Sequence, residues 1–141
     1  MKSDFQTKVK MATFTNKQIM DTYKVGNQGG IRKSNKTQCV VLIINPGVHK
    51  YSDSFMGPTV INYDGAFRKG SKDQVMKYQN KMLAETNLPI HVYYGKLDQY
   101  RYIGEYERFG PYQTVYNAEG HKVFVFPLIK KFTYDFDIFE Y

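Results

Sequence analysis

The residue types best suited to holding a flat polar group lie between residues 50 and 87. Tyr51 and Asp53 open this stretch, and Tyr63-Asp64-Gly65 follows the short β-branched run Thr59-Val60-Ile61. A tyrosine ring offers an apolar face and a polar tip, and a carboxylate accepts hydrogen bonds from amines. Two tyrosines, two carboxylates and a glycine at the ends of short strands therefore favour a pocket for one hydrogen-bonding ring, such as a nucleobase.

Each of these residues also has a structural interpretation. Tyr51 and Tyr63 could belong to an apolar core, because tyrosine is common in buried strands. Asp53 could accept hydrogen bonds from the amides of its own turn, as aspartate does in loops. The sequence leaves both interpretations open.

Two cationic segments accompany the candidate pocket. Arg32, Lys33 and Ser34 belong to the connector GGIRKS, and Arg68, Lys69 and Lys72 follow the glycine of the pocket motif. The net charge is +7, the isoelectric point is about 9.4, and 13 tyrosines and 10 phenylalanines bring the aromatic content to 16%. Positive charge combined with aromatic rings favours a nucleic-acid partner, with these six residues on the phosphate backbone. The alternative is a β-rich core solubilised by lysines.

Hydrophobic periodicity and turn residues predict two helices and a series of short strands. A capping box at Thr15–Gln18 predicts a helix that ends at Gly26, and a second box at Ser71–Gln74 predicts a helix that ends near Asn87. Residues 29–34 are expected to be a flexible connector. The predicted strands are 38–44, which would be buried and central, then 59–63, 89–94, 100–107, 112–116 and 122–128. The last four strands favour an antiparallel meander that closes into a barrel or a curved sheet.

Several classes of site have no signature in this sequence. Zinc-ligand spacings, a nucleophile elbow and a phosphate-binding loop are absent, so we expect no metal and no cofactor. Cys39 lies in an apolar run and is expected to be a buried thiol in a reducing cytoplasm. No apolar run has the length of a membrane span, and no secretory signal opens the chain. A dispersed carboxylate site for a metal-dependent nuclease, built from Asp64, Asp73, Glu85 and Lys96, remains an alternative.

The order of several motifs resembles the SRA (YDG) domains, in the variant that precedes HNH nuclease modules in bacterial modification-dependent restriction enzymes. The matching segments span about residues 28–128. They are GGIRKS, CVVLI, Tyr51-x-Asp53-x-Phe55, Tyr63-Asp64-Gly65, Gln79-Asn80-x-x-Leu83-Ala84, Tyr102-x-Gly104-x-Tyr106 and Val123-Phe-Val-Phe-Pro127-Leu128. Many SRA domains have Tyr-Thr-Gly where this chain has Tyr-Asp-Gly.

The resemblance implies an α+β fold with a curved antiparallel, SRA/PUA-like β-barrel and two or three flanking helices. It implies that a modified cytosine flips out of duplex DNA and stacks between Tyr51 and Tyr63, with Asp53 or Asp64 accepting a hydrogen bond from the base amine. Residues 1–27 would then be an arm and a helix on the barrel, residues 28–128 the SRA-like domain and residues 129–141 an extension.

The resemblance also implies a DNA reader rather than an enzyme. Its partner would be double-stranded DNA that carries 5-methylcytosine or 5-hydroxymethylcytosine, with a nuclease module or a second copy of the chain as further partners. The context would be the cytoplasm of a bacterium, or a phage. A PUA-like RNA-binding domain is the remaining alternative.

Overall fold

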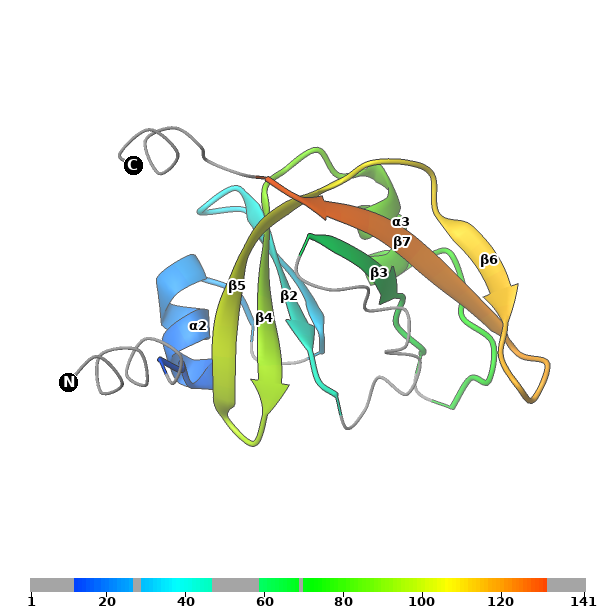
Figure 1. Ribbon diagram of the computed structural model, residues 1–141, viewed down its shortest axis with the longest axis horizontal. Helices are drawn as coiled ribbons and strands as arrows, with labels where there is room; N and C mark the ends of the chain where they lie inside the picture. Colours follow the sequence, from blue (N-terminus) through cyan, green and yellow to red (C-terminus); the bar gives the residue numbers. More distant parts are fainter. Residues whose placement is uncertain (1–11, 27–28, 47–58, 69, 132–141) are drawn as a thin grey trace.

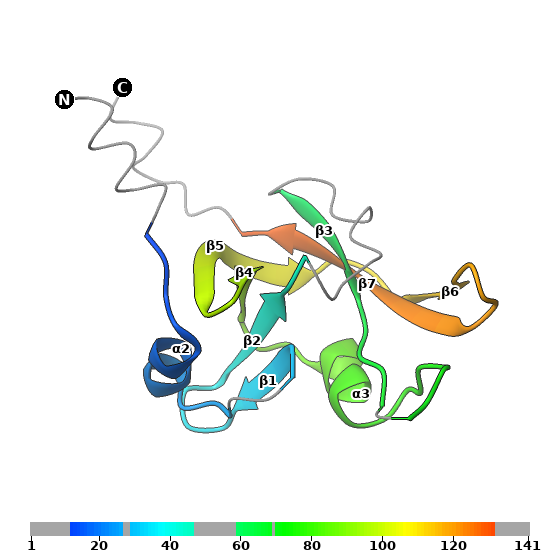
Figure 2. The same ribbon diagram turned by 90° about the horizontal axis from the view of Figure 1, so that it is seen from below.

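The computed structural model describes residues 12–26, 29–46, 59–68 and 70–131, and within them two helices flank one strongly curled sheet (Figures 1 and 2). The helices are α2 (Asn16–Tyr23) and α3 (Tyr78–Glu85). The strands are β1 (Ile31–Ser34), β2 (Cys39–Ile44), β3 (Val60–Asp64), β4 (Ile90–Lys96), β5 (Gln99–Arg108), β6 (Gln113–Tyr116) and β7 (Lys122–Lys130). Within the described ranges, neither helix has the length and apolar character needed to cross a membrane.

The sheet is curved as predicted, but one strand pair is parallel, so the sheet is mixed rather than wholly antiparallel. Its strand order is β1-β2-β4-β5-β7-β3, with β6 beside the first half of β7. Every neighbouring pair is antiparallel except β2 and β4, which run parallel. A parallel pair needs a long crossover, and here the chain between β2 and β4 includes β3 and α3. The sheet curls into a half-barrel, as expected for an SRA/PUA-like α+β fold.

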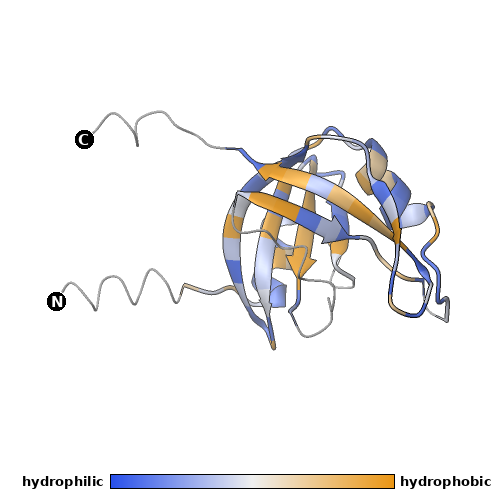
Figure 3. Ribbon diagram, turned by 45° about the vertical axis from the view of Figure 1, so that its right-hand side comes forward, coloured by the Kyte–Doolittle hydropathy of each residue, from blue (hydrophilic) through white to orange (hydrophobic). Residues whose placement is uncertain are grey.

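Strand β2 is buried on both faces, which explains why its sequence is apolar without alternation. All six of its residues are buried. Side chains alternate between the two faces of a strand, so Val40, Leu42 and Ile44 enter the main core while Cys39, Val41 and Ile43 pack with Ile19 of α2. The predicted buried, central strand and buried thiol are therefore confirmed. Figure 3 shows hydrophobic residues along the strands of the sheet, interrupted by hydrophilic ones.

Helix α2 begins as the sequence predicts. The Thr15 hydroxyl accepts a hydrogen bond from the Gln18 amide (3.1 Å), and the Gln18 side chain accepts one from the Thr15 amide (2.8 Å), which completes the capping box. The helix ends before the predicted Gly26, because Lys24 adopts the left-handed conformation that terminates it (φ 57°).

Helix α3 begins later than predicted. The expected capping box at Ser71–Gln74 does not form, because Asp73 and Gln74 bond to strand β7 instead. Asp73 Oδ1 accepts from the Lys122 amide and Gln74 Oε1 from the Phe124 amide, both at 2.8 Å. The helix starts only at Tyr78, and Leu83 is its buried apolar anchor.

The expected connector at residues 29–34 is also partly a strand. Ile31 to Ser34 form β1, whose register pairs Ile31 with Leu42 and Ser34 with Cys39. Ile31 packs in the main core, and Lys33, on the same face of the strand, is exposed. The reason is that β2 needs an antiparallel neighbour for its backbone groups on this edge, and no local pattern in GGIRKS reveals that need.

Candidate functional site

The predicted motif Tyr63-Asp64-Gly65 lies at the end of β3, an outer strand of the curled sheet. Its register with β7 places Tyr63 opposite Phe126 and Asp64 opposite Val125. Neighbouring residues of a strand point to opposite faces. Tyr63 therefore shares the core face with Phe126, and Asp64 is directed to the other face.

Tyr63 is enclosed on the core side. Its side chain is 3% exposed, and its hydroxyl donates a hydrogen bond to the Gly30 carbonyl oxygen at 3.3 Å, just before β1. Burial raises the pKa of the Tyr63 hydroxyl, and the neighbouring Asp64 carboxylate raises it further while Arg32 opposes the shift. The hydroxyl is thus a neutral donor that links β3 to the residue just before β1. Asp64 is itself 7% exposed.

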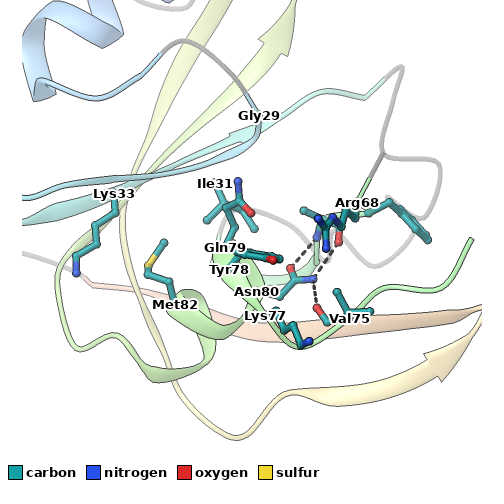
Figure 4. A pocket seen from close by; sticks show the side chains of 12 residues that line it. Gly29, Ile31, Lys33, Arg68, Val75, Lys77, Tyr78, Gln79, Asn80 and Met82 are labelled. Atoms are coloured by element: carbon teal, nitrogen blue, oxygen red, sulfur yellow. Dashed lines mark hydrogen bonds between the residues drawn. The ribbon is translucent and has the colours of Figure 1, made fainter. Parts of the chain in front are cut away.

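Two buried amide side chains hold the backbone after β3. Gln74 Nε2 donates to the Gly65 carbonyl oxygen at 2.7 Å, while its Oε1 accepts from Phe124 of β7. Asn80 of α3 accepts from the Ala66 amide at 2.8 Å and donates to the Ala66 and Val75 carbonyl oxygens at 2.9 and 3.0 Å. Figure 4 shows the three Asn80 bonds as dashed lines. The end of the pocket motif is therefore fixed to both β7 and α3.

Gly65 is required by this arrangement. A Cβ atom at this position would lie 2.7 Å from Asn80 Oδ1 and 2.7 Å from Gln74 Oε1. Both side chains are buried and fully engaged, so neither can move away without losing hydrogen bonds. The glycine allows the two amides to approach the backbone closely.

A groove of about 960 Å³ opens beside this clamp. It runs between β1, the segment after Gly65 and the start of α3, and Figure 4 shows Lys33 and Arg68 toward opposite ends with Ile31 and Tyr78 between them. The Arg68 guanidinium lies over the Tyr78 ring, 5.1 Å from its centroid. The groove thus brings together one residue from each predicted cationic segment.

The other predicted backbone contacts differ in their surroundings. The Arg32 side chain is 9% exposed, and its guanidinium donates to the Gly29 carbonyl oxygen and to Asn16 Oδ1 within the protein. Ser34 is buried and accepts from the Thr37 amide. Lys72 is exposed. Lys69, like the predicted pocket residues Tyr51 and Asp53, lies outside the described residues.

The carboxylates of the nuclease alternative have separate places in the fold. In the described ranges, no group of three or more His, Cys, Asp and Glu residues has the arrangement of a metal site. Asp73 accepts from the Lys122 amide and lies 3.4 Å from His121 Nδ1, and the backbone bond first, then His121, lowers the pKa of its carboxyl. Glu85 ends α3, and Lys96 ends β4.

Sequence reasoning missed the roles of Gln74 and Asn80. Gln74 fits the third position after Ser71, so the pattern suggests a helix cap although the side chain bonds to β7. Asn80 lies beside the apolar stripe of its helix, where a side chain facing a loop and one facing solvent look alike. The local signal for this clamp is an amide side chain beside the apolar stripe of a helix that follows a glycine motif.

Three solved structures show what this fold is similar to. The SUVH5 SRA domain in complex with methylated CHH DNA has a TM-score of 0.64 and 20% identity over 86% of this chain and 87% of that chain. The SUVH5 SRA domain bound to fully hydroxymethylated CG DNA has a TM-score of 0.57 and 20% identity over 75% and 76%. The DNA modification-dependent restriction endonuclease AspBHI has a TM-score of 0.62 and 15% identity over 80% and 37%.

These likenesses show that the chain has the fold of SRA domains. They cover between 75% and 86% of its length. No protein-family model and no curated protein sequence matches the chain.

Proposed function

We propose that this chain binds double-stranded DNA and reads a modified cytosine that is flipped out of the duplex. The observation that carries the proposal is the SRA fold, with the motif Tyr63-Asp64-Gly65 at the end of β3 beside a cationic groove. Structures with this fold have been solved with methylated and with hydroxymethylated DNA. A modification at the 5-position of cytosine is therefore the proposed mark.

Base flipping is energetically reasonable for such a pocket. Extruding a base costs a few kcal/mol of pairing and stacking. Stacking on one aromatic side chain returns roughly 1–3 kcal/mol, and an aspartate at the exocyclic amine distinguishes cytosine from thymine. We assign the two stacking rings to Tyr51 and Tyr63.

We assign the acceptor for the base amine to Asp53, because the geometry of β3 argues against Asp64. Tyr63 and Asp64 are neighbours in β3, so their side chains point to opposite faces. A base that stacks on the Tyr63 ring lies on the core side of the strand, away from the Asp64 carboxylate. Asp64 instead contributes negative charge near the Tyr63 hydroxyl.

The enclosed state of Tyr63 has a consequence for binding. At 3% exposure the ring has no open face, so a flipped base must displace a group that now covers it. Recognition of the modified base therefore requires a local rearrangement around Tyr63. DNA contacts that need no such rearrangement form first. Lys33, Arg68 and Lys72 are exposed and suited to such phosphate contacts, together with Lys69.

We further propose that the chain is the specificity module of a modification-dependent restriction system in a bacterial cytoplasm. AspBHI supports this, because the similar region is 37% of that endonuclease chain. The chain would then bind DNA, with cleavage by a separate nuclease module.

A binding panel tests the proposal. Three duplexes of one sequence carry cytosine, 5-methylcytosine or 5-hydroxymethylcytosine at one position, and affinity is measured by fluorescence anisotropy at fixed salt. We expect a modified duplex to bind at least tenfold more tightly than the unmodified one. Equal affinity for all three duplexes would contradict the proposal.

Incubation with modified plasmid and Mg²⁺ or Mn²⁺ tests the assignment as a reader. We expect intact plasmid. Cleavage that is lost in Asp64→Ala would instead establish a metal-dependent nuclease.

A further inference from the structure

The groove beside the clamp has the chemistry of a site for unpaired nucleic acid. Among the residues that the structure describes, its lining includes Lys33, Arg68 and Lys77 and no carboxylate. It also includes Tyr78, whose side chain is 62% exposed. Proteins that bind single strands combine a cationic groove along the phosphates with aromatic rings on which bases stack.

Tyr78 stands between this groove and a second one. The second groove, of about 660 Å³, shares Lys77 and Tyr78 with the first. It adds Lys81 of α3 and Tyr112, the residue before β6. Its described lining also includes one carboxylate, that of Glu85. The two grooves therefore form a track with cations along it and a tyrosine ring in its middle.

The Tyr78 ring buries little of its surface in the fold. It is the first residue of α3 and lies outside the apolar core, and its ring lies against the Arg68 guanidinium. A base can stack on a tyrosine ring or on a guanidinium plane, so the pair offers two stacking surfaces at one point of the track.

We propose that this track binds an unpaired stretch of DNA, with a base stacked at Tyr78 and Arg68 and the phosphates beside Lys33, Lys77 and Lys81. The site goes beyond the proposed function, because it needs neither a modified cytosine nor the pocket at Tyr63. Single-stranded DNA next to a flipped nucleotide or at a duplex end is its ligand.

Anisotropy of a labelled oligothymidine of about twelve nucleotides tests the site, since this probe contains no cytosine. We expect Tyr78→Asn to weaken binding by roughly 5- to 150-fold. Asparagine suits the test because Tyr78 has a φ of 55°, which asparagine adopts readily. Tyr78→Phe keeps the ring and should bind like the unaltered chain.

The matched control is Tyr116→Asn, which removes a tyrosine that is 66% exposed on β6 and lies outside both grooves. Arg68→Gln should weaken oligothymidine binding and reduce its salt dependence, while Lys24→Gln, an exposed cation elsewhere, should not. Circular dichroism confirms that each variant is folded.

The proposal is overturned if oligothymidine does not bind, if Tyr78→Asn and Tyr116→Asn have equal effects, or if oligouridine binds more tightly than oligothymidine. These outcomes are independent of the duplex panel. Equal binding of modified and unmodified duplexes would contradict the proposed function but not the single-strand site. Absence of oligothymidine binding would contradict the single-strand site but not the proposed function.

Discussion

At the scale of single residues, the motif at the end of β3 is held in place by hydrogen bonds to distant parts of the chain. Gly65 is held by Gln74, Ala66 is held by Asn80, and the Tyr63 hydroxyl reaches Gly30. The sequence indicated Tyr63, Asp64 and Gly65 by type and spacing. It did not indicate the two amides, because their partners lie on β7 and on the backbone after Gly65, which only the folded chain brings near.

Substitutions at Tyr63 separate stacking from packing. Tyr63→Phe should keep affinity for modified duplex within about threefold, since it retains the ring and loses one hydrogen bond, and should cost about 1 kcal/mol of stability. Tyr63→Leu fills the core with a non-aromatic group, so it should weaken binding of modified duplex by roughly 1–3 kcal/mol and leave unmodified duplex unchanged. Anisotropy titrations give both affinities. If Tyr63→Leu weakens both duplexes alike, Tyr63 is a core residue alone.

Removing the Asn80 amide should destabilise the whole chain. Asn80→Leu leaves the Ala66 amide and two carbonyl oxygens without their partner, which should lower the free energy of unfolding by about 2–4 kcal/mol. Urea denaturation measures this change. The adjacent Gln79 is exposed, so Gln79→Leu should change the free energy by less than about 0.5 kcal/mol. Equal effects of the two substitutions would show that the clamp contributes nothing.

At the scale of elements, strands were predicted better than the ends of helices. Residues 38–44, 89–94, 100–107 and 122–128 each fall largely within an observed strand, because apolar and aromatic runs bounded by turn residues are a local signal. The start of α3 depends on hydrogen bonds to the distant strand β7. The strand β1 depends on antiparallel pairing with β2, which follows after a four-residue turn. The parallel β2–β4 pair likewise follows from the long crossover rather than from either strand.

The outer face of β4 and β5 carries His91, a histidine with two aromatic neighbours. His91 Nδ1 lies 2.9 Å from the Tyr102 hydroxyl, and the Tyr23 ring of α2 stacks on the imidazole with centroids 5.1 Å apart. Burial lowers the pKa of His91, and Glu105 opposes this shift only in part.

A lowered pKa makes the protein less stable in acid through this residue. The unfolded chain takes up the His91 proton near its ordinary pKa of about 6.5, before the folded chain does. The contribution of His91 to stability is therefore complete above that pH and falls as the pH is lowered below it. We expect His91→Gln to flatten the decline of the unfolding free energy below about pH 6.5, measured by urea denaturation. A variant that declines as steeply as the unaltered chain would refute this assignment.

At the scale of the whole molecule, a net charge of +7 accompanies exposed cations along one groove. Phosphate contacts release counterions, so affinity falls with salt by a log–log slope of about −0.9 per phosphate on duplex DNA. Lys33, Arg68, Lys69 and Lys72 are the proposed contacts, and Arg32 is left out because its guanidinium is bonded within the protein. About four contacts predict a slope of about −3 to −4 for unmodified duplex. A salt titration with a slope near zero would remove duplex DNA from the partners.

The central claim is that the modified base is read outside the helix. The most direct measurement places 2-aminopurine next to the target cytosine in a 5-methylcytosine duplex and in its unmodified counterpart, and follows fluorescence at saturating protein. We expect the signal to rise several-fold in the modified duplex, because flipping the neighbouring base unstacks the probe, and to stay nearly constant in the unmodified one. A flat signal in both duplexes would contradict base flipping, even where the modified duplex binds more tightly.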